Sequence, residues 1–187
     1  MKELPKDFTL IRYGLKVRLV NDGDAEFILS LRADPVRTKY MITLDNEIRF
    51  QEEWIKEYKK REKRGLDYYF IYSNMNNMSI GVNRISKIDT EKKTAKSSSW
   101  IVVTGLKYES IKMLAIKNEI AFNLLNIKAL WGEVHRENYK AIRINKLFGY
   151  NFKDLREDFL YITIEKEDFF KACKNETVLK FLNSNSD

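Results

Sequence analysis

The chain has 187 residues, of which 44% are hydrophobic and 33% charged, a balance typical of a folded globular protein. This length fits one domain with a sizeable core, so we expect a single domain over residues 1–187. Within it, residues 1–14 are expected to be a loose lead-in and residues 175–187 a frayed tail. The longest apolar runs, such as Ile101–Val103, are far shorter than the roughly 20 residues that span a bilayer, which excludes an ordinary transmembrane helix.

The formal net charge of +7 favours anionic partners. The densest basic run, Lys56–Arg64, is mixed with glutamates on a predicted helix, so we interpret it as a solvated helix face. We therefore expect no nucleic-acid partner and no membrane association. Cys173, the single cysteine, cannot form an internal disulfide, and no apolar stretch follows Met1–Asp7. These features predict a cytoplasmic protein, in which Cys173 packs against neighbours rather than acting as a nucleophile.

The first half of the chain predicts strands and two helices. Residues 16–20 alternate charged and apolar side chains, as a half-buried strand does. Asp24 can cap a helix over about 24–33, which Pro35 ends. Asp45 can cap a second helix over about 46–63, and three strands then follow. The helix should bury Phe50, Trp54, Ile55 and Tyr58, and the strands should cover Tyr68–Tyr72, Ser79–Ile85 and Ser98–Val103.

The second half predicts a helix inserted between strands that pair in parallel. A helix over about 110–125 is apolar around much of its circumference, which indicates packing against a sheet. A strand at Ala129–His135, a helix at about 138–148 ended by Gly149, and strands at about 150–155 and Leu160–Glu165 follow. This order predicts the α/β (α+β) class: a mixed sheet of about seven strands with helices on both faces.

Residues 129–150 carry a recognisable motif, ALWGEVHRENYKAIRINKLFGY. A strand is followed by Asn138-x-x-Ala141, an amphipathic helix and then Gly149-Tyr150. With the element order over about 16–165, this motif resembles the GNAT superfamily of N-acetyltransferases. The segments at 31–41 and 80–88 are similar to the branch of ribosomal-protein N-terminal acetyltransferases and of amino-sugar N-acetyltransferases in pseudaminic acid synthesis.

The resemblance implies a GNAT fold in which the two strands of a central parallel pair splay apart. It also implies an acyltransferase that moves an acetyl group from acetyl-CoA to a primary amine by direct attack in a ternary complex, without a metal. The acceptor implied first is a nucleotide-linked amino sugar. A protein N-terminal amine, or a non-catalytic CoA- or amine-binding protein on the same scaffold, remain the alternatives. A monomer or a homodimer is expected.

The resemblance also assigns residues to acetyl-CoA. The strand backbone of Ile101, Val102 and Val103 is implied to hold the thioester and pantetheine, with Asn138 and Ala141 beside them. The alternative for Asn138 is a role as the N-cap of the following helix alone. The pyrophosphate is implied to bind the backbone at the start of the helix over about 110–125, at Tyr108, Glu109, Ser110, Ile111, Lys112 and Met113. The sequence departs from the family here, because Tyr108 and Ser110 replace two loop residues that are small in the family, and Gly105 replaces an Arg or Gln. A side chain at Tyr108 can crowd the phosphates.

Three residues are candidates for catalysis. The alternatives are a solvated or salt-bridged strand residue for Glu133 and a capping or surface role for His135. Alternation along the strand puts Trp131, Glu133 and His135 on one face, and a carboxylate there can take the proton from the acceptor ammonium. His135, the only histidine, is the next candidate for this proton transfer. Asn145 stands where many GNAT members have the tyrosine that protonates the leaving thiolate. Its amide can hydrogen-bond to sulfur or carbonyl but cannot donate a proton in that sense.

Overall fold

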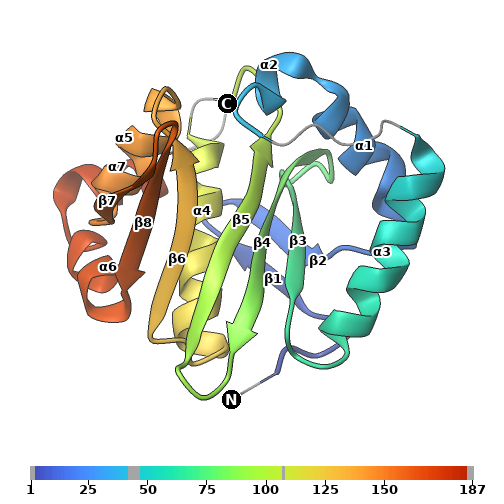
Figure 1. Ribbon diagram of the computed structural model, residues 1–187, viewed down its shortest axis with the longest axis horizontal. Helices are drawn as coiled ribbons and strands as arrows, with labels where there is room; N and C mark the ends of the chain where they lie inside the picture. The colour runs from blue at the N-terminus through green and yellow to red at the C-terminus, as the bar shows by residue number, and fades with distance from the viewer. Residues whose placement is uncertain (1–2, 42–46, 107, 185–187) are drawn as a thin grey trace.

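The computed structural model describes residues 3–41, 47–106 and 108–184. An eight-stranded sheet runs through it in the order β1-β2-β3-β4-β5-β6-β8-β7 (Figure 1). Every neighbouring pair is antiparallel except β5 and β6, which confirms the predicted mixed sheet with a central parallel pair. The strands are β1 Thr9–Arg12, β2 Leu15–Leu19, β3 Tyr68–Ser73, β4 Ser79–Asp89, β5 Thr94–Val102, β6 Ala129–His135, β7 Asn151–Arg156 and β8 Phe159–Glu165.

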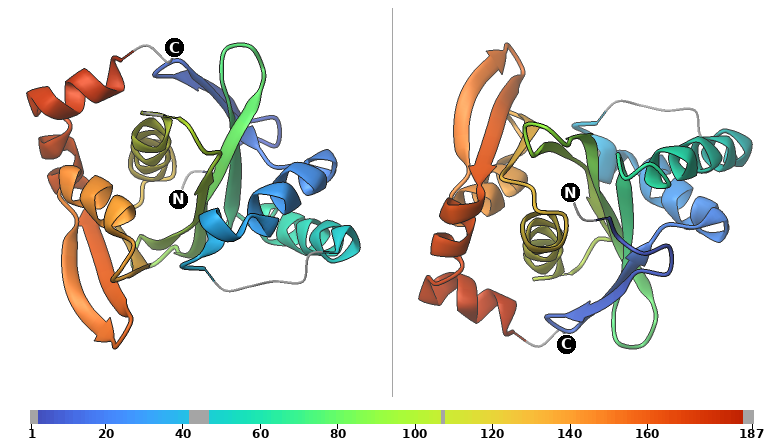
Figure 2. Two further views of the ribbon diagram at one scale, coloured as in Figure 1. Left: turned by 90° about the horizontal axis from the view of Figure 1, so that it is seen from above. Right: turned by 90° about the horizontal axis from the view of Figure 1, so that it is seen from below.

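Helices cover both faces of the sheet (Figure 2). Helices α1 and α3 bury one face, where Ile28 and Ile55 pack with Val82 and Ile101. Helix α4 fills the opposite face and continues through a π-helical turn, Ile120–Leu124, whose Phe122 is fully buried. The helices are α1 Ala25–Ala33, α2 Pro35–Thr38, α3 Ile48–Glu62, α4 Glu109–Glu119, α5 Tyr139–Leu147, α6 Lys166–Ala172 and α7 Glu176–Leu182.

Both ends of the chain are more ordered than predicted. The lead-in contains β1, because Tyr13 and Gly14 take positive φ angles and turn the chain back onto β2. The frayed tail is wrong over 176–182, where Asn175 caps α7 and its buried Val178 and Leu182 contact the core.

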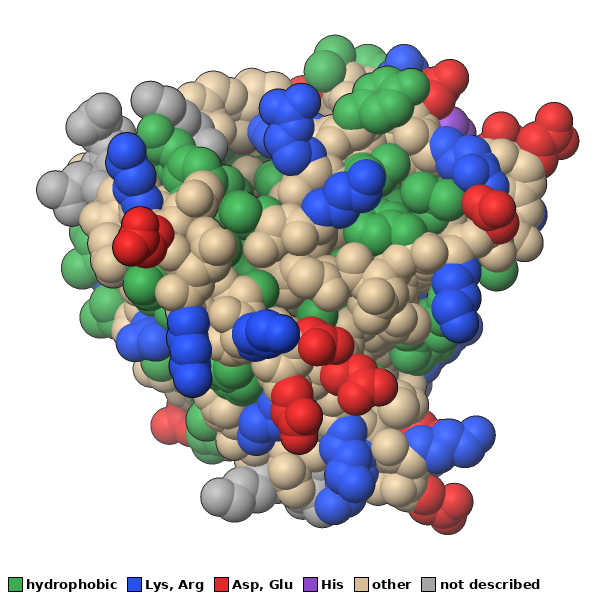
Figure 3. Space-filling model, turned by 90° about the vertical axis from the view of Figure 1, so that its left-hand side faces the viewer, with side chains coloured by type: hydrophobic (Ala, Val, Ile, Leu, Met, Phe, Trp, Pro, Cys, Tyr) green, Lys and Arg blue, Asp and Glu red, His purple; other side chains and the backbone are tan. Residues whose placement is uncertain are grey.

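The side of the molecule that carries these C-terminal helices mixes basic and acidic side chains (Figure 3).

Helix α3 differs in detail from the prediction: Phe50 is 40% exposed, while Gln51 and Glu62 are buried. The predicted cap Asp45 lies outside the described residues.

The parallel pair is short and then separates. Pairing between β5 and β6 covers only Thr94–Lys96 against Ala129–Trp131, although both strands continue beyond it. Figure 1 shows the two strands diverging, with α4 behind the gap. At the point of separation the backbones still lie close, since a Cβ on Gly132 would sit 3.0 Å from the carbonyl oxygen of Ser97. On the side facing β6, the gap leaves main-chain groups of β5 with which none of the described strands pairs, as the resemblance implied.

Candidate functional site

The gap between the diverging strands opens into a cavity of about 310 Å3. The last residues of β5 form one wall, and the N-terminal ends of α4 and α5 form another. Residues around α2 close the remaining side. The cavity brings together six of the residues assigned to acetyl-CoA: Ile101, Val102, Val103, Ser110, Asn138 and Ala141. Val36, Arg37, Tyr40, Trp100, Thr104, Lys140 and Ile144 complete the lining.

Three buried polar atoms of residues that line the cavity have no hydrogen-bond partner within the part of the chain that the structure describes. They are Oγ of Ser110, Nε1 of Trp100 and Nε of Arg37, of which only the last is close to an ion-pair partner, the carboxylate of Asp34 at 3.2 Å. Leaving such a group unpaired costs about 1–3 kcal/mol, so a ligand that accepts a hydrogen bond there recovers that cost. Asn138, in contrast, is already used locally: its Oδ1 accepts the backbone N–H of Ala141 at 3.1 Å and caps α5.

The start of α4 differs from the open phosphate-binding turn that the resemblance implied. The ring of Tyr108 lies 5.6 Å from that of Phe181 on α7, and its φ of −120° needs no glycine. The carboxylate of Glu109 accepts the backbone N–H of Tyr108 at 3.0 Å. Lys112 donates from Nζ to the carbonyl of Ser184 at 2.6 Å. The C-terminal segment therefore holds Tyr108 and Lys112. The carboxylate of Glu109 stands at the N-terminus of α4, where the CoA pyrophosphate was expected.

The other residues of this predicted turn lie elsewhere. Ile111 and Met113 belong to the hydrophobic core, and the carbonyl of Met113 accepts the Nδ2 group of Asn83 at 3.0 Å. Only Ser110, of the six residues from 108 to 113 assigned to CoA, lines the cavity. Lys107, which flanks the turn in sequence, lies outside the described residues.

Glu133 is an ion-paired residue on the face of β6 that also carries Trp131. Its carboxylate lies 2.8 Å from Nζ of Lys96 and 3.4 Å from a guanidinium nitrogen of Arg156. The hydrogen bond from Lys96 lowers the pKa of Glu133 below its usual value. A carboxylate with a lowered pKa is a weaker proton acceptor, so this geometry disfavours Glu133 as the base. Glu133 is also absent from the lining of the cavity at the gap.

His135 stands beside that cavity, in contact with a residue that sequence reasoning missed. Its ring stacks on Tyr40, a lining residue, with centroids 4.9 Å apart, and meets Phe159 edge-on at 5.2 Å. Nδ1 of His135 accepts the backbone N–H of Glu137 at 3.2 Å. In the neutral ring the proton is therefore assigned to Nε2, so His135 can donate there but cannot accept.

Asn145 is buried on α5, and its amide is occupied. Nδ2 donates to the carbonyl of Ala141 at 2.8 Å, and the residue does not line the cavity. Cys173 is half-buried beside the core, and burial raises the pKa of Cys173 to about 12, so the thiolate needed for nucleophilic attack is disfavoured.

Sequence reasoning missed Tyr40, Trp100 and Arg37 as lining residues. Trp100 had a signal, because it directly precedes the predicted strand residues Ile101–Val103. Tyr40 and Arg37 lie in the segment 31–41 that carries part of the family resemblance, but no local pattern placed them at the site, since only the fold brings the segment around α2 against β5 and α5. Among the described residues no group of three His, Cys, Asp or Glu side chains is placed to hold a metal. None of the described helices combines the length and the apolar character needed to cross a bilayer.

No family model and no curated protein sequence matches the chain. Solved structures do. FdhC, a nucleotide-linked sugar GNAT, superposes with a TM-score of 0.82 at 26% identity, over 94% of this chain and 99% of that one. Spermidine N-acetyltransferase from Vibrio cholerae in complex with CoA and spermine superposes with a TM-score of 0.73 at 18% identity, over 84% of this chain and 98% of that one.

A dodecameric structure of the Vibrio cholerae enzyme, in an intermediate state, gives a TM-score of 0.70 at 18% identity, over 83% of this chain and 96% of that one. At these identities the Vibrio structures support the fold, and the FdhC likeness covers nearly all of both chains. Together with the parallel pair that separates over a lined cavity, these likenesses show that the chain belongs to the GNAT superfamily.

Proposed function

We propose that the protein is an acetyltransferase that moves an acetyl group from acetyl-CoA to a primary amine. The observation that carries this proposal is the cavity where β5 and β6 separate. The unpaired edge of β5 and the starts of α4 and α5 meet there. Acetyl-CoA supplies the thioester, and the main chain at Ile101–Val103 can hold an extended chain as a further strand would.

The unpaired polar atoms in the cavity fit a ligand of this kind. Ser110 and Trp100 each present a buried group that can donate a hydrogen bond, and acetyl-CoA has amide and thioester carbonyls that accept one. Donors aimed at a carbonyl stabilise the negative charge that develops on its oxygen during attack by an amine. The same two side chains are therefore proposed to orient the thioester and to polarise it.

Proton transfers fall to other residues than those predicted. We place Tyr40 as the donor that returns a proton to the leaving thiolate, because it lines the cavity and Asn145 does not. His135 stacks on Tyr40 and positions its ring. The attacking amine must first be deprotonated. The acceptor either binds already neutral or gives its proton to a water molecule, so Glu133 is not needed as the base.

The proposed acceptor is a nucleotide-linked amino sugar. The likeness to FdhC supports it, and so does the positive balance of the chain. A peptide N-terminus is the second candidate acceptor. Only the sequence resemblance supports it, because a peptide calls for a long groove lined by acidic side chains.

The test combines binding and turnover. Calorimetry should give micromolar affinity for acetyl-CoA, about −8 kcal/mol. Release of free CoA thiol should then follow when nucleotide-linked amino sugars, spermidine and a peptide are offered in turn. Ser110→Ala should weaken acetyl-CoA binding, whereas Ser30→Ala, on the exposed part of α1, should not. Absence of binding at millimolar acetyl-CoA contradicts the proposal, and binding without thiol release from any amine supports a non-catalytic binding protein.

A further inference from the structure

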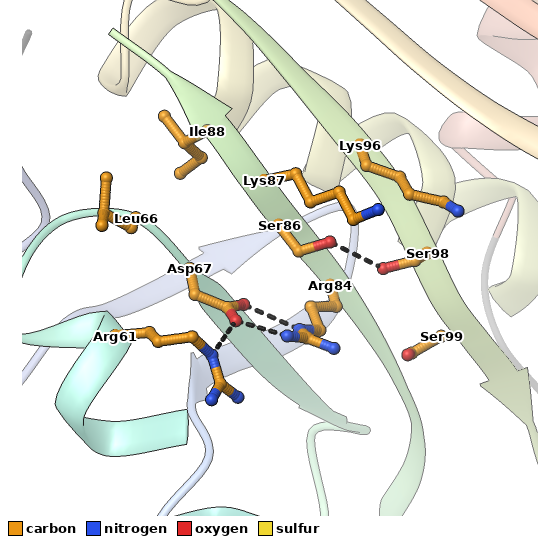
Figure 4. A pocket seen from close by; sticks show the side chains of 10 residues that line it. All are labelled: Arg61, Leu66, Asp67, Arg84, Ser86, Lys87, Ile88, Lys96, Ser98 and Ser99. Carbon is orange, nitrogen blue, oxygen red and sulfur yellow. Dashed lines mark hydrogen bonds and ion pairs between the residues drawn. The ribbon is translucent and has the colours of Figure 1, made fainter. Parts of the chain in front are cut away.

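A second cavity, of about 530 Å3, lies on the face of β4 and β5 opposite α4 (Figure 4). Four cationic side chains line it: Arg61 from α3, Arg84 and Lys87 from β4, and Lys96 from β5. The only carboxylate among its lining residues is that of Asp67. The lining is therefore strongly positive, unlike the mixed surface of the C-terminal helices.

The two arginines are held in place by Asp67. Its carboxylate accepts Nε of Arg61 at 2.9 Å and Nε of Arg84 at 2.7 Å, with a further contact to Nη2 of Arg84. The Asp67 side chain is only 2% exposed, whereas that of Arg61 is 38% exposed. The guanidinium of Arg84 also lies 4.9 Å from the ring centroid of Trp54. One buried carboxylate thus fixes two guanidiniums, so the group keeps a net positive charge toward the cavity.

The two lysines are gathered on the opposite rim by an aromatic ring. Nζ of Lys96 lies 5.1 Å and Nζ of Lys87 lies 5.8 Å from the ring centroid of Trp131 on β6. Lys96 also pairs with Glu133 at 2.8 Å. Glu133 therefore orients a lysine of the cavity, a role that accounts for a carboxylate on this strand without assigning it a proton transfer.

The backbone is unusual at two positions of the cavity wall. Lys87 has φ of 49° and Ser99 has φ of 51°, each where the register of β4 and β5 shifts. The left-handed region costs a residue with a Cβ about 1–2 kcal/mol. Bulges of this type redirect side chains and are frequent beside active sites. Both strained residues line this cavity, which indicates that the strand is shaped for it.

The two cavities are consecutive along β5. Lys96, Ser98 and Ser99 line the basic cavity, and Trp100–Thr104 line the cavity at the gap. A strand rises about 3.3 Å per residue, so Ser98 and Ile101 are separated by roughly 10 Å. A molecule whose amine reaches the gap can therefore place a group roughly 10 Å from that amine among the four cations.

We propose that the basic cavity binds the diphosphate of the acceptor, through Arg61, Arg84, Lys87 and Lys96, and so selects an anionic amino sugar over a polyamine. This inference rests on the proposed acetyl transfer and adds the charge of its acceptor. Guanidiniums and ammoniums bind phosphate oxygens by charge-assisted hydrogen bonds. The same cations repel spermidine, which is itself positively charged.

Calorimetry with UDP as the probe tests the cavity, first with the protein alone and then in the presence of saturating acetyl-CoA. UDP should bind, and Lys87→Gln and Lys96→Gln should each raise its Kd about tenfold, equivalent to about 1.4 kcal/mol. Lys87→Arg keeps the charge and should bind UDP within about threefold of the parent protein. Lys171→Gln, an equal change of charge on the exposed side of α6, should leave the Kd unchanged. Acetyl-CoA affinity should stay the same in all four variants.

Three results overturn the inference. If UDP does not bind at millimolar concentration while acetyl-CoA binds normally, the cavity is not a diphosphate site and the acetyltransferase proposal stands. If acetyl-CoA displaces UDP, the phosphates occupy the CoA site instead. If spermidine binds more tightly than UDP, the acceptor is not selected by positive charge. Loss of acetyl-CoA binding by the parent protein would instead contradict the proposed function.

Discussion

Replacing Lys117 by methionine should stabilise the protein in a pH-dependent way. Lys117 lies on α4 and is 1% exposed, and its Nζ donates to Oγ of Ser97, the first residue of β5 beyond the paired segment. Burial lowers the pKa of Lys117 from 10.5 to about 7. Methionine has nearly the same length and no charge, so Lys117→Met removes the buried ammonium and keeps the packing.

The magnitude follows from the two pKa values. A difference of about 3.5 units at about 1.36 kcal/mol per unit gives at most about 5 kcal/mol. Below pH 7 both states carry the proton, and the folded protein bears the whole cost of burying it. Between pH 7 and 10.5 only the unfolded chain keeps the proton, so stability rises with pH, and above 10.5 the cost is gone. Losing the hydrogen bond to Ser97 offsets about 1 kcal/mol.

Urea unfolding of the parent protein and of Lys117→Met measures this effect. The variant should be more stable by up to about 4 kcal/mol at pH 6 and nearly equal to the parent at pH 10. Lys171→Met, at an exposed position on α6, should change stability by less than about 0.5 kcal/mol at either pH. The reasoning is refuted if Lys117→Met is destabilising at pH 6, or if its effect is the same at both pH values.

Three further changes test the site. Asn138→Ala should lower the free energy of unfolding by about 1 kcal/mol, because a helix cap is lost; unchanged acetyl-CoA affinity would make Asn138 a cap only. Glu109→Gln should tighten acetyl-CoA binding measured by calorimetry, since a carboxylate leaves the helix end, and weaker binding would argue against a phosphate there. Glu133→Gln should lower kcat by less than tenfold, because Lys96 already lowers the pKa of Glu133. A measured loss of about 10²–10⁴ in kcat would restore Glu133 as the base.

Local patterns in the sequence predicted the types and the order of the elements from β2 to β8, apart from the short helix α2. Alternation along Ala129–His135 placed Trp131, Glu133 and His135 on one face, and the burial of that strand agrees with this. Asn138 and Gly149 marked the two ends of α5 correctly, since a cap and a left-handed turn depend on neighbouring residues only. Edge strand β1 and helix α7 were missed because pairing with β2 and packing on the core, not local pattern, order them.

The sequence by itself determined the mixed fold, the motif that resembles the GNAT superfamily and the residues of β5 at its centre. Tertiary structure alone decided what their side chains do. Glu133 meets Lys96 across 37 positions of sequence, and Tyr40 meets His135 across nearly a hundred, so no local pattern reveals either contact. Lys117 is buried because α4 is enclosed by the sheet and the C-terminal helices, a consequence of packing rather than of its neighbours in sequence. Charge and proton affinity depend on such distant partners, and these are fixed only when the chain is folded.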